Sequence, residues 1–304
     1  MPLTIAVIGG ANTDVFGLAG EPVVAGDSAP GTVRIGPGGV GRNVAENLAR
    51  LGCDVRLVTA VGEGVDAEAL VAECRHAGID VRVAPAAGLP CPRYVCVVDP
   101  NGQPVAAVSD MRAMDRLTPE AVSTFRSAAD GADALVLDAN LPEQTIQWVC
   151  EQWRDRPVLV DAVSVAKARR LRGCLAGLHT LKANVDEAAE IAGTPGGDLA
   201  AAAEAMLRAG VRRVVVTDGE SGGLYAERSE RLRFSALPVR PVNATGAGDA
   251  FMAGIAYGTV AGFPVQQTLA FAAAMAAFAL ESERTVSERI ELAAVLDRAA
   301  EVVW

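Results

Sequence analysis

Residues 242 to 254 read VNATGAGDAFMAG, a glycine-rich segment that leads into an apolar run. Gly246, Ala247 and Gly248 bring backbone N–H groups together just before an apolar helical run. Unpaired N–H groups and the positive end of a helix dipole make such a turn a site for anions. Asp249 follows at once, and an acid there is useful if it removes a proton from a hydroxyl that attacks a bound phosphoryl group. The alternative is an ordinary glycine-rich turn capped by an aspartate.

The composition sets limits on partners and location. Hydrophobic residues make up 51% of the 304 residues and aromatic residues only 4%, so Ala, Val and Leu must fill the core. A formal net charge of −10 argues against a nucleic-acid partner, which requires a basic face. The apolar run 269–280 is shorter than the roughly 20 residues of a membrane span, and the N-terminus is typical of a core strand rather than a signal peptide. We therefore expect a cytoplasmic protein with no membrane partner.

Short β-branched runs alternate with helical patterns along most of the chain. The expected strands are 5–8, 55–59, 134–137, 158–160, 180–181 and 213–217, and the expected helices are 40–51, 67–77, 119–129, 143–154 and 199–209. Near-continuous apolar strands separated by helices predict a parallel sheet covered on both faces. Residues 13–35 and 93–108 are extended and carry no helical period, so we expect them to form a small sheet that acts as a lid. No linker or repeat divides the chain, which predicts one domain over 1–304.

Polar residues gather where the expected strands end. Because the carboxyl ends of parallel strands share one edge, and α/β proteins bind ligands there, this pattern favours a site. Each residue alone is more simply explained as a cap or turn residue. The residues are Asn12 and Asp14, Asp138 and Asn140, Asp161, Lys182 and Asn184, and Thr217 with Asp218 and Gly219.

A second glycine cluster, GPGGVGRN at 36–43, precedes another helical run. Its glycines allow close backbone approach to a ligand, and Asn43 offers both hydrogen-bond donors and acceptors. It partly matches a dinucleotide motif, but about 25 residues separate it from the first strand, so an NAD-dependent oxidoreductase is disfavoured. A purely structural turn remains the alternative.

Taken in order, these motifs resemble the PfkB (ribokinase-like) family of carbohydrate and nucleoside kinases. The matching motifs are IGGANTD at 8–14, GGVGRN at 38–43, LKANVDE at 181–187, VVVTDGESGG at 214–223 and NATGAGDAFMAG at 243–254. The resemblance implies a three-layer α/β/α fold with a mainly parallel sheet and a small β lid. It also implies phosphoryl transfer from MgATP to a primary hydroxyl of a small sugar or nucleoside.

The resemblance implies a role for each matching residue. Asp249 would be the base, and the N–H groups of Gly246, Ala247 and Gly248 would form the anion hole. Residues matching acceptor-binding positions are Asn12, Asp14, Gly39, Asn43 and Asn140. Residues matching nucleotide-binding positions are Asn184, Thr217, Gly219 and Gly222, with Glu187 organising Mg²⁺ through water.

Three further residues are candidates on the acceptor side. Lys167, one of only two lysines, is either a phosphate or substrate contact or a solvated lysine beside Arg169 and Arg170. Asp27 and Ser28, in the expected lid, are candidates for reading the base of a nucleoside. A buried acceptor group there would discriminate strongly against an analogue that lacks a ring N–H.

The chain departs from the family pattern at three places. It has Lys-Ala-Asn at 182–184 where Lys-Pro-Asn is common, and Asp218 where relatives carry a neutral residue. Asn243 replaces the usual Asp near which many relatives bind an activating K⁺. Lids in this family often pair between subunits, which implies a homodimer through the lid. The alternatives are a kinase for another sugar or nucleoside, or a non-catalytic sugar sensor, which would not need Asp249 as a base.

Overall fold

The computed structural model describes residues 2–194 and 197–302. Within those ranges a nine-stranded sheet has the order β13-β12-β11-β10-β9-β8-β1-β4-β5. Every pair from β11 to β5 is parallel, whereas β12 and β13 run antiparallel at one edge. The strands are β1 (Thr4–Ile8), β4 (Asp54–Thr59), β5 (Asp80–Val83), β8 (Ala134–Asp138), β9 (Val158–Asp161), β10 (Thr180–Asn184), β11 (Arg213–Thr217), β12 (Gly223–Glu227) and β13 (Arg231–Phe234).

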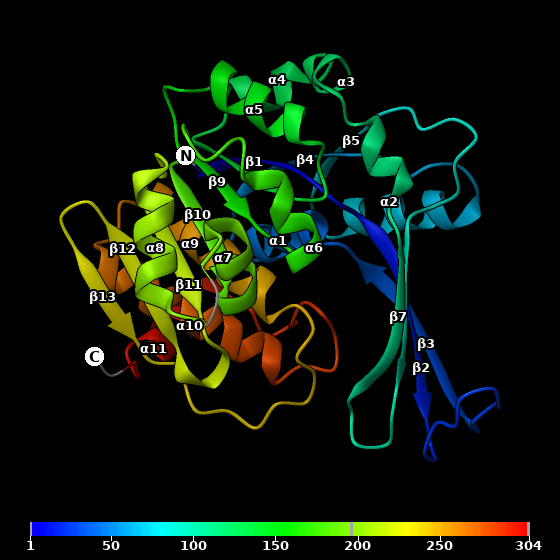
Figure 1. Cartoon of the computed structure of the whole chain (residues 1–304). Helices are drawn as coiled ribbons and strands as arrows, with labels where there is room; N and C mark the ends of the chain where they lie inside the picture. Colours follow the sequence, from blue (N-terminus) through cyan, green and yellow to red (C-terminus); the bar gives the residue numbers. More distant parts are fainter. Residues whose placement is uncertain (1, 195–196, 303–304) are drawn as a thin grey trace.

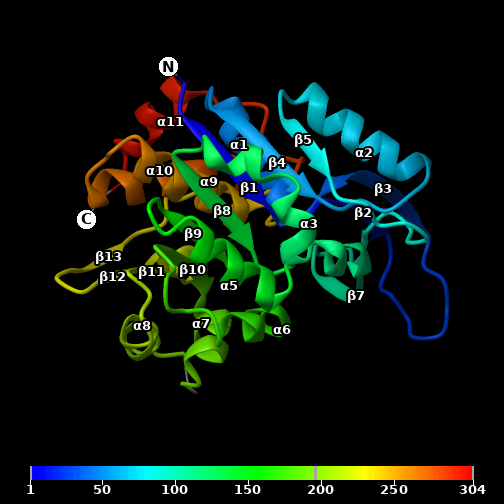
Figure 2. The same ribbon diagram turned by 90° about the horizontal axis from the view of Figure 1, so that it is seen from above.

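Helices cover both faces of this sheet and give three layers (Figures 1 and 2). One face carries α1 (Val40–Arg50), α9 (Ala247–Val260), α10 (Val265–Leu280) and α11 (Leu292–Ala299), and the other carries α5 (Glu143–Gln152), α7 (Val185–Ala192) and α8 (Leu199–Arg208). Side chains alternate along a strand, so Ile5 and Val7 pack under the first set and Ala6 and Ile8 under the second. The near-continuous apolar strands of the sequence are explained by burial on both faces.

A smaller sheet extends away from the main sheet as a lid (Figure 1). Its strands, in the order β3-β2-β6-β7, are β2 (Asn12–Ala19), β3 (Gly31–Gly38), β6 (Arg93–Val98) and β7 (Pro104–Asp110). The chain enters β2 only four residues after β1 ends, so the lid is attached directly at the carboxyl edge of the main sheet. The α/β fold with a mainly parallel sheet and a small β lid is confirmed.

The remaining helices lie around these sheets. They are α2 (Val65–His76), α3 (Pro119–Ser123), α4 (Arg126–Asp130), α6 (Val165–Ala168), and short 3₁₀ turns at Arg112–Arg116, Arg169–Leu171 and Gly219–Ser221. In the part of the chain that the structure describes, no helix is both long and apolar enough to span a bilayer.

The expected helix over 119–129 is wrong, because the segment forms α3 and α4 instead. The hydroxyls of Ser123 and Thr124 donate to the carbonyl oxygens of Glu120 and Ala121, each at 2.7 Å. Such local bonds compete with a continuing helical ladder, and the helix ends there.

The expected strand over 180–181 is too short. β10 runs on to Asn184, so Lys182 lies inside the strand rather than after it. Lys182 interrupts the apolar run in the sequence. In the structure its charge is paired with the carboxylate of Asp161.

Candidate active site

The TGAGD turn forms the N-terminus of α9, where Gly246 is the N-cap with a φ of 90°. Only glycine adopts this conformation without strain. A Cβ at this position would lie 2.2 Å from the carbonyl oxygen of Thr285, so the two backbones approach closer than any side chain allows. No side chain caps α9 within the described residues, and the N–H groups of its first turn are left for a ligand.

Asp249 lies in the first turn of α9 and accepts a hydrogen bond from Nδ2 of Asn43, 2.7 Å from its Oδ2. Burial, reinforced by the nearby carboxylate of Asp161, raises the pKa of Asp249 to about 7. The bond from Asn43 and the charge of Lys182 lower it in part. A carboxyl group with a pKa near neutrality suits a general base at physiological pH.

Lys182 places a positive charge under this turn. Its Nζ is 3.0 Å from Oδ2 of Asp161 at the end of β9, and the two residues are only 6% and 2% exposed. Burial alone would lower the pKa of Lys182, but the carboxylates of Asp161 and Glu187 raise it, so the amine stays charged. A Cβ on Gly248 would lie 2.8 Å from Nζ, which puts the ammonium against the backbone of the proposed anion hole.

Lys182, Asp161 and Asp138 belong to the strand-end pattern that favours a site, but the sequence assigns none of them a role. The carboxylate of Asp138 accepts from the N–H groups of Gly10 at 2.7 Å and Asn140 at 2.9 Å. The bond from Gly10 ties the segment after β1 to the end of β8, and the bond from Asn140 closes the turn that follows β8. The signal that could have found the three residues was present: each is a charged residue in or directly after an apolar strand.

Asn140 and Lys167 come together, because Nζ of Lys167 donates to Oδ1 of Asn140. Burial lowers the pKa of Lys167, which is half-buried. The interpretation of Lys167 as a solvated surface lysine is therefore wrong.

Val163 has a φ of 70°, which is rare for a β-branched residue and often marks functional sites.

Asn12, Asp14 and Gly39 lie where the lid meets the main sheet. Nδ2 of Asn12 donates to Oδ1 of Asp14 at 2.6 Å, and burial raises the pKa of Asp14 to about 6. Gly39 precedes α1 with a φ of 99°, and a Cβ there would lie 2.5 Å from the carbonyl oxygen of Gly10. A cleft of about 1270 Å³ opens between the lid, α1 and α2, with Asp14, Arg42 and Thr245 in its wall, whereas Asp249 and Asn43 are not among its lining residues.

The residues expected to bind nucleotide follow the next two strands. Asn184 and Glu187 form a reciprocal capping box at the start of α7, and Asn184 is paired in register with Thr217. Burial raises the pKa of Glu187, and Lys182 opposes this rise. Gly219 and Gly222 flank the turn after β11 with φ values of 53° and 83°. At Gly222 a Cβ would meet the carbonyl oxygen of Phe234 at 1.9 Å, so glycine is required there for the fold itself.

Asp27 and Ser28 lie apart from these residues. They belong to the exposed connection between β2 and β3, at the far end of the lid (Figure 1). The N–H of Ser28 donates to Oδ1 of Asp27 at 2.7 Å, a local turn contact.

Comparison with known proteins gives consistent matches over the chain. The model for the pfkB family carbohydrate kinases matches residues 3–291. The chain is 33% identical over 297 residues to the pseudouridine kinase of Escherichia coli K12, covering 96% of this chain and 95% of that protein. It is 32% identical to the uncharacterized sugar kinase YeiI of the same strain, covering 91% and 78%. A solved carbohydrate kinase from Agrobacterium tumefaciens superposes with a TM-score of 0.85 at 30% identity, covering 99% of this chain and 98% of the other.

Proposed function

The chain belongs to the pfkB family of carbohydrate kinases, and from that premise we propose that it is an ATP-dependent pseudouridine kinase of the cytoplasm. It would transfer the γ-phosphoryl group of ATP to the 5′-hydroxyl of pseudouridine, giving pseudouridine 5′-phosphate and ADP. The observation that carries the phosphotransferase assignment is the position of Asp249: a half-buried acid with a pKa near 7, directly beside an uncapped helix N-terminus.

In this proposal Asp249 takes the proton of the 5′-hydroxyl while that oxygen attacks the γ-phosphorus. The bond from the γ-phosphorus to the bridging oxygen breaks, and ADP leaves. The N–H groups of Gly246, Ala247 and Gly248, together with the ammonium of Lys182, stabilise the negative charge that develops on the transferred group. The contact between Asn43 and Asp249 keeps the carboxylate directed at the acceptor.

The residues present fit MgATP as co-substrate. No side chain caps the first turn of α9, and Glu187 supplies a carboxylate anchored by Asn184 in the first turn of α7. Mg²⁺ keeps several waters in protein sites, so we assign Glu187 a water-mediated contact. Bound Mg²⁺ would neutralise charge on the phosphates. Asn184, Thr217, Gly219 and Gly222 would hold the nucleotide at the adjoining strand ends.

The acceptor assignment is supported by the similarity to the Escherichia coli pseudouridine kinase over nearly the whole of both chains. Asn12, Asp14, Gly39 and Asn43 would hold the sugar hydroxyls, with Asn140 and Lys167 at the opposite side of the acceptor site. Asp27 or Ser28 would read the extra ring N–H of pseudouridine after lid closure, because a site built to pair such a group rejects an analogue without it.

A homodimer through the lid is also part of the proposal. One face of the lid sheet is apolar and exposed, because alternate residues of β3, β6 and β7 share a face. These residues are Val33, Ile35, Val95, Val97 and Val108. A second copy of the same lid offers a matching apolar surface.

The experiment is a coupled ADP-release assay with MgATP and a panel of acceptors: pseudouridine, uridine, ribose, adenosine, inosine and fructose. We expect turnover to favour pseudouridine strongly over uridine. Turnover on another acceptor would keep the kinase and discard the pseudouridine assignment. Binding without any turnover would favour a sugar sensor. KCl is compared with choline chloride, because Asn243 replaces the acidic residue near which relatives bind K⁺.

A further inference from the structure

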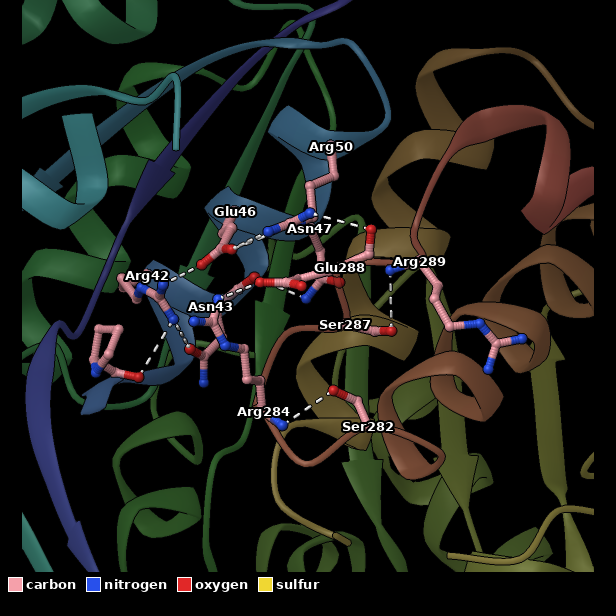
Figure 3. Close-up of polar contacts among 11 residues, drawn as sticks. Arg42, Asn43, Glu46, Asn47, Arg50, Ser282, Arg284, Ser287, Glu288 and Arg289 are labelled. Atoms are coloured by element: carbon pink, nitrogen blue, oxygen red, sulfur yellow. Dashed lines mark hydrogen bonds and ion pairs between the residues drawn. The ribbon is translucent and has the colours of Figure 1, made fainter. Parts of the chain in front are cut away.

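Arg42 lies in the first turn of α1, is 5% exposed, and was not among the residues expected in the site. Its Nη1 donates to Oδ1 of Asn43 at 2.8 Å, and its Nη2 donates to the carboxylate of Glu46 one turn further on. Figure 3 shows the guanidinium group between these two side chains. Arg42 is therefore one residue removed from the proposed base, since Asn43 is the residue that contacts Asp249.

The contact with Arg42 decides which way the Asn43 amide points. An asparagine side chain carries one acceptor oxygen and one NH₂ donor, and a half-turn exchanges them. A guanidinium group has donors only, so the oxygen of Asn43 must face Arg42. The NH₂ group is then directed at Oδ2 of Asp249, 2.7 Å from Nδ2.

The guanidinium group is itself anchored from further along the helix. Oε1 of Glu46 accepts from Nε and Nη2 of Arg50 at 3.1 and 3.0 Å, and Arg50 reaches the carbonyl oxygen of Glu288 at 3.5 Å (Figure 3). Within the described structure Nε of Arg42 is buried without a partner. A buried charge with an unpaired donor adds little to stability, so packing alone gives no reason for an arginine here.

We propose that Arg42 is a positioning residue for phosphoryl transfer, which orients the Asn43 amide toward Asp249 and so holds the base in place. The inference rests on the proposed function, because it requires Asp249 to act on an acceptor hydroxyl. Asp249 also faces Asp138, Asp161 and Lys182 from β8, β9 and β10. When Arg42 is removed, the side-chain amide of Asn43 is free to turn. Asp249 then loses a hydrogen-bond donor that favours its ionised form, so the pKa of Asp249 rises.

The test measures kcat/KM for the best acceptor of the panel, at saturating MgATP, between about pH 5.5 and about pH 9. The pH dependence of kcat/KM reports the pKa values of the essential acid and base groups in the acceptor-free enzyme. We expect Arg42→Met to lose roughly 10- to 100-fold near pH 6 and much less near pH 9, with an unchanged KM for MgATP. No loss, or an equal loss at every pH, would overturn the proposal.

Two further variants separate positioning from folding. Arg42→Met alone leaves Glu46 without its buried partner, so it is repeated with Glu46→Gln, which carries no charge. In an Asn43→Ala background, Arg42→Met should cause no further loss, because its effect passes through Asn43. Additive losses would overturn the inference.

Arg213→Met serves as the matched control. Arg213 pairs with Glu227 at 3.2 Å at the start of β11, the end of the strand opposite to the site, and its loss should leave the pH profile unchanged. A shifted profile in this control would overturn the assignment to Arg42. If the wild-type protein turns over no acceptor at all, the proposed function itself fails, and this inference fails with it.

Discussion

The side-chain amide of Asn43 donates to the carboxylate of Asp249 at 2.7 Å, although 206 residues separate them in the chain. The contact joins the first turns of α1 and α9, each of which begins after a glycine with positive φ. The two glycine-rich clusters, 36–43 and 246–248, therefore belong to one site. The acid is held where an acceptor hydroxyl and a phosphate would have to meet.

Asp249 makes stability depend on pH. Its pKa is about 7 in the folded protein against an ordinary 3.8, so the folded state binds the proton more tightly. Protonation of Asp249 therefore contributes to the free energy of unfolding. This contribution is complete below about pH 3.8 and is lost as the pH rises through 7. Asp249→Asn cannot ionise and should be more stable than wild type at pH 8, by up to about 4 kcal/mol, because a pKa change of one corresponds to about 1.4 kcal/mol.

Urea unfolding of wild type and Asp249→Asn at about pH 4.5 and about pH 8 measures this difference. The gap should widen with pH. A gap that is absent at both values, or that narrows toward pH 8, would mean that Asp249 is not destabilised by its burial.

Gly246→Ala should remove activity. The alanine would have to adopt a φ of 90° and displace the carbonyl oxygen of Thr285, which moves the N–H groups of the proposed anion hole. We expect kcat to fall by roughly 100-fold or more. Gly262→Ala is the control: it has a φ of 71° with nothing within 4 Å, so it should cost about 1–2 kcal/mol of stability and no kcat. Similar kcat losses in both variants would refute the close-approach argument.

Lys182→Met should destabilise the fold by about 3–5 kcal/mol, because it leaves the buried carboxylate of Asp161 unpaired. Adding Asp161→Leu removes the orphaned charge and should recover most of that stability. Activity should stay low in both variants, since neither restores the positive charge next to Gly248. Thermal melting and ADP release, measured on the same samples, separate the two effects. A double variant with restored turnover would show that the pair is structural only.

Asp27→Ala and Ser28→Ala test the reading of the base. If either side chain pairs with the extra ring N–H, its loss should bring the kcat/KM ratio of pseudouridine to uridine closer to one and leave the KM for MgATP unchanged. Asn101→Ala, at the tip of the other lid hairpin, is the matched control. A ratio that stays at the wild-type value in both variants would move base recognition to another part of the lid.

The sequence predicts most of this architecture because burial on both faces gives the strands of a parallel sheet a continuous apolar signal. It fails where a polar side chain hides a regular element: Lys182 masks the extension of β10, because its neutralising partner Asp161 comes from another strand. The sequence also gives no sign of the role of Arg42. That role depends on the contact between Asn43 of α1 and Asp249 of α9, which only the fold brings together. Local motifs can be read from the chain, whereas contacts between distant segments require the fold.

The most direct test of Asp249 as the base compares ADP release by wild type and Asp249→Asn with MgATP, in the presence and absence of pseudouridine. We expect pseudouridine-dependent release in the wild type and a loss of roughly 10²- to 10⁴-fold in the variant, with ATP binding retained. Equal release by the two proteins would contradict the assignment of Asp249 as the base, and with it the proposed reaction at this site.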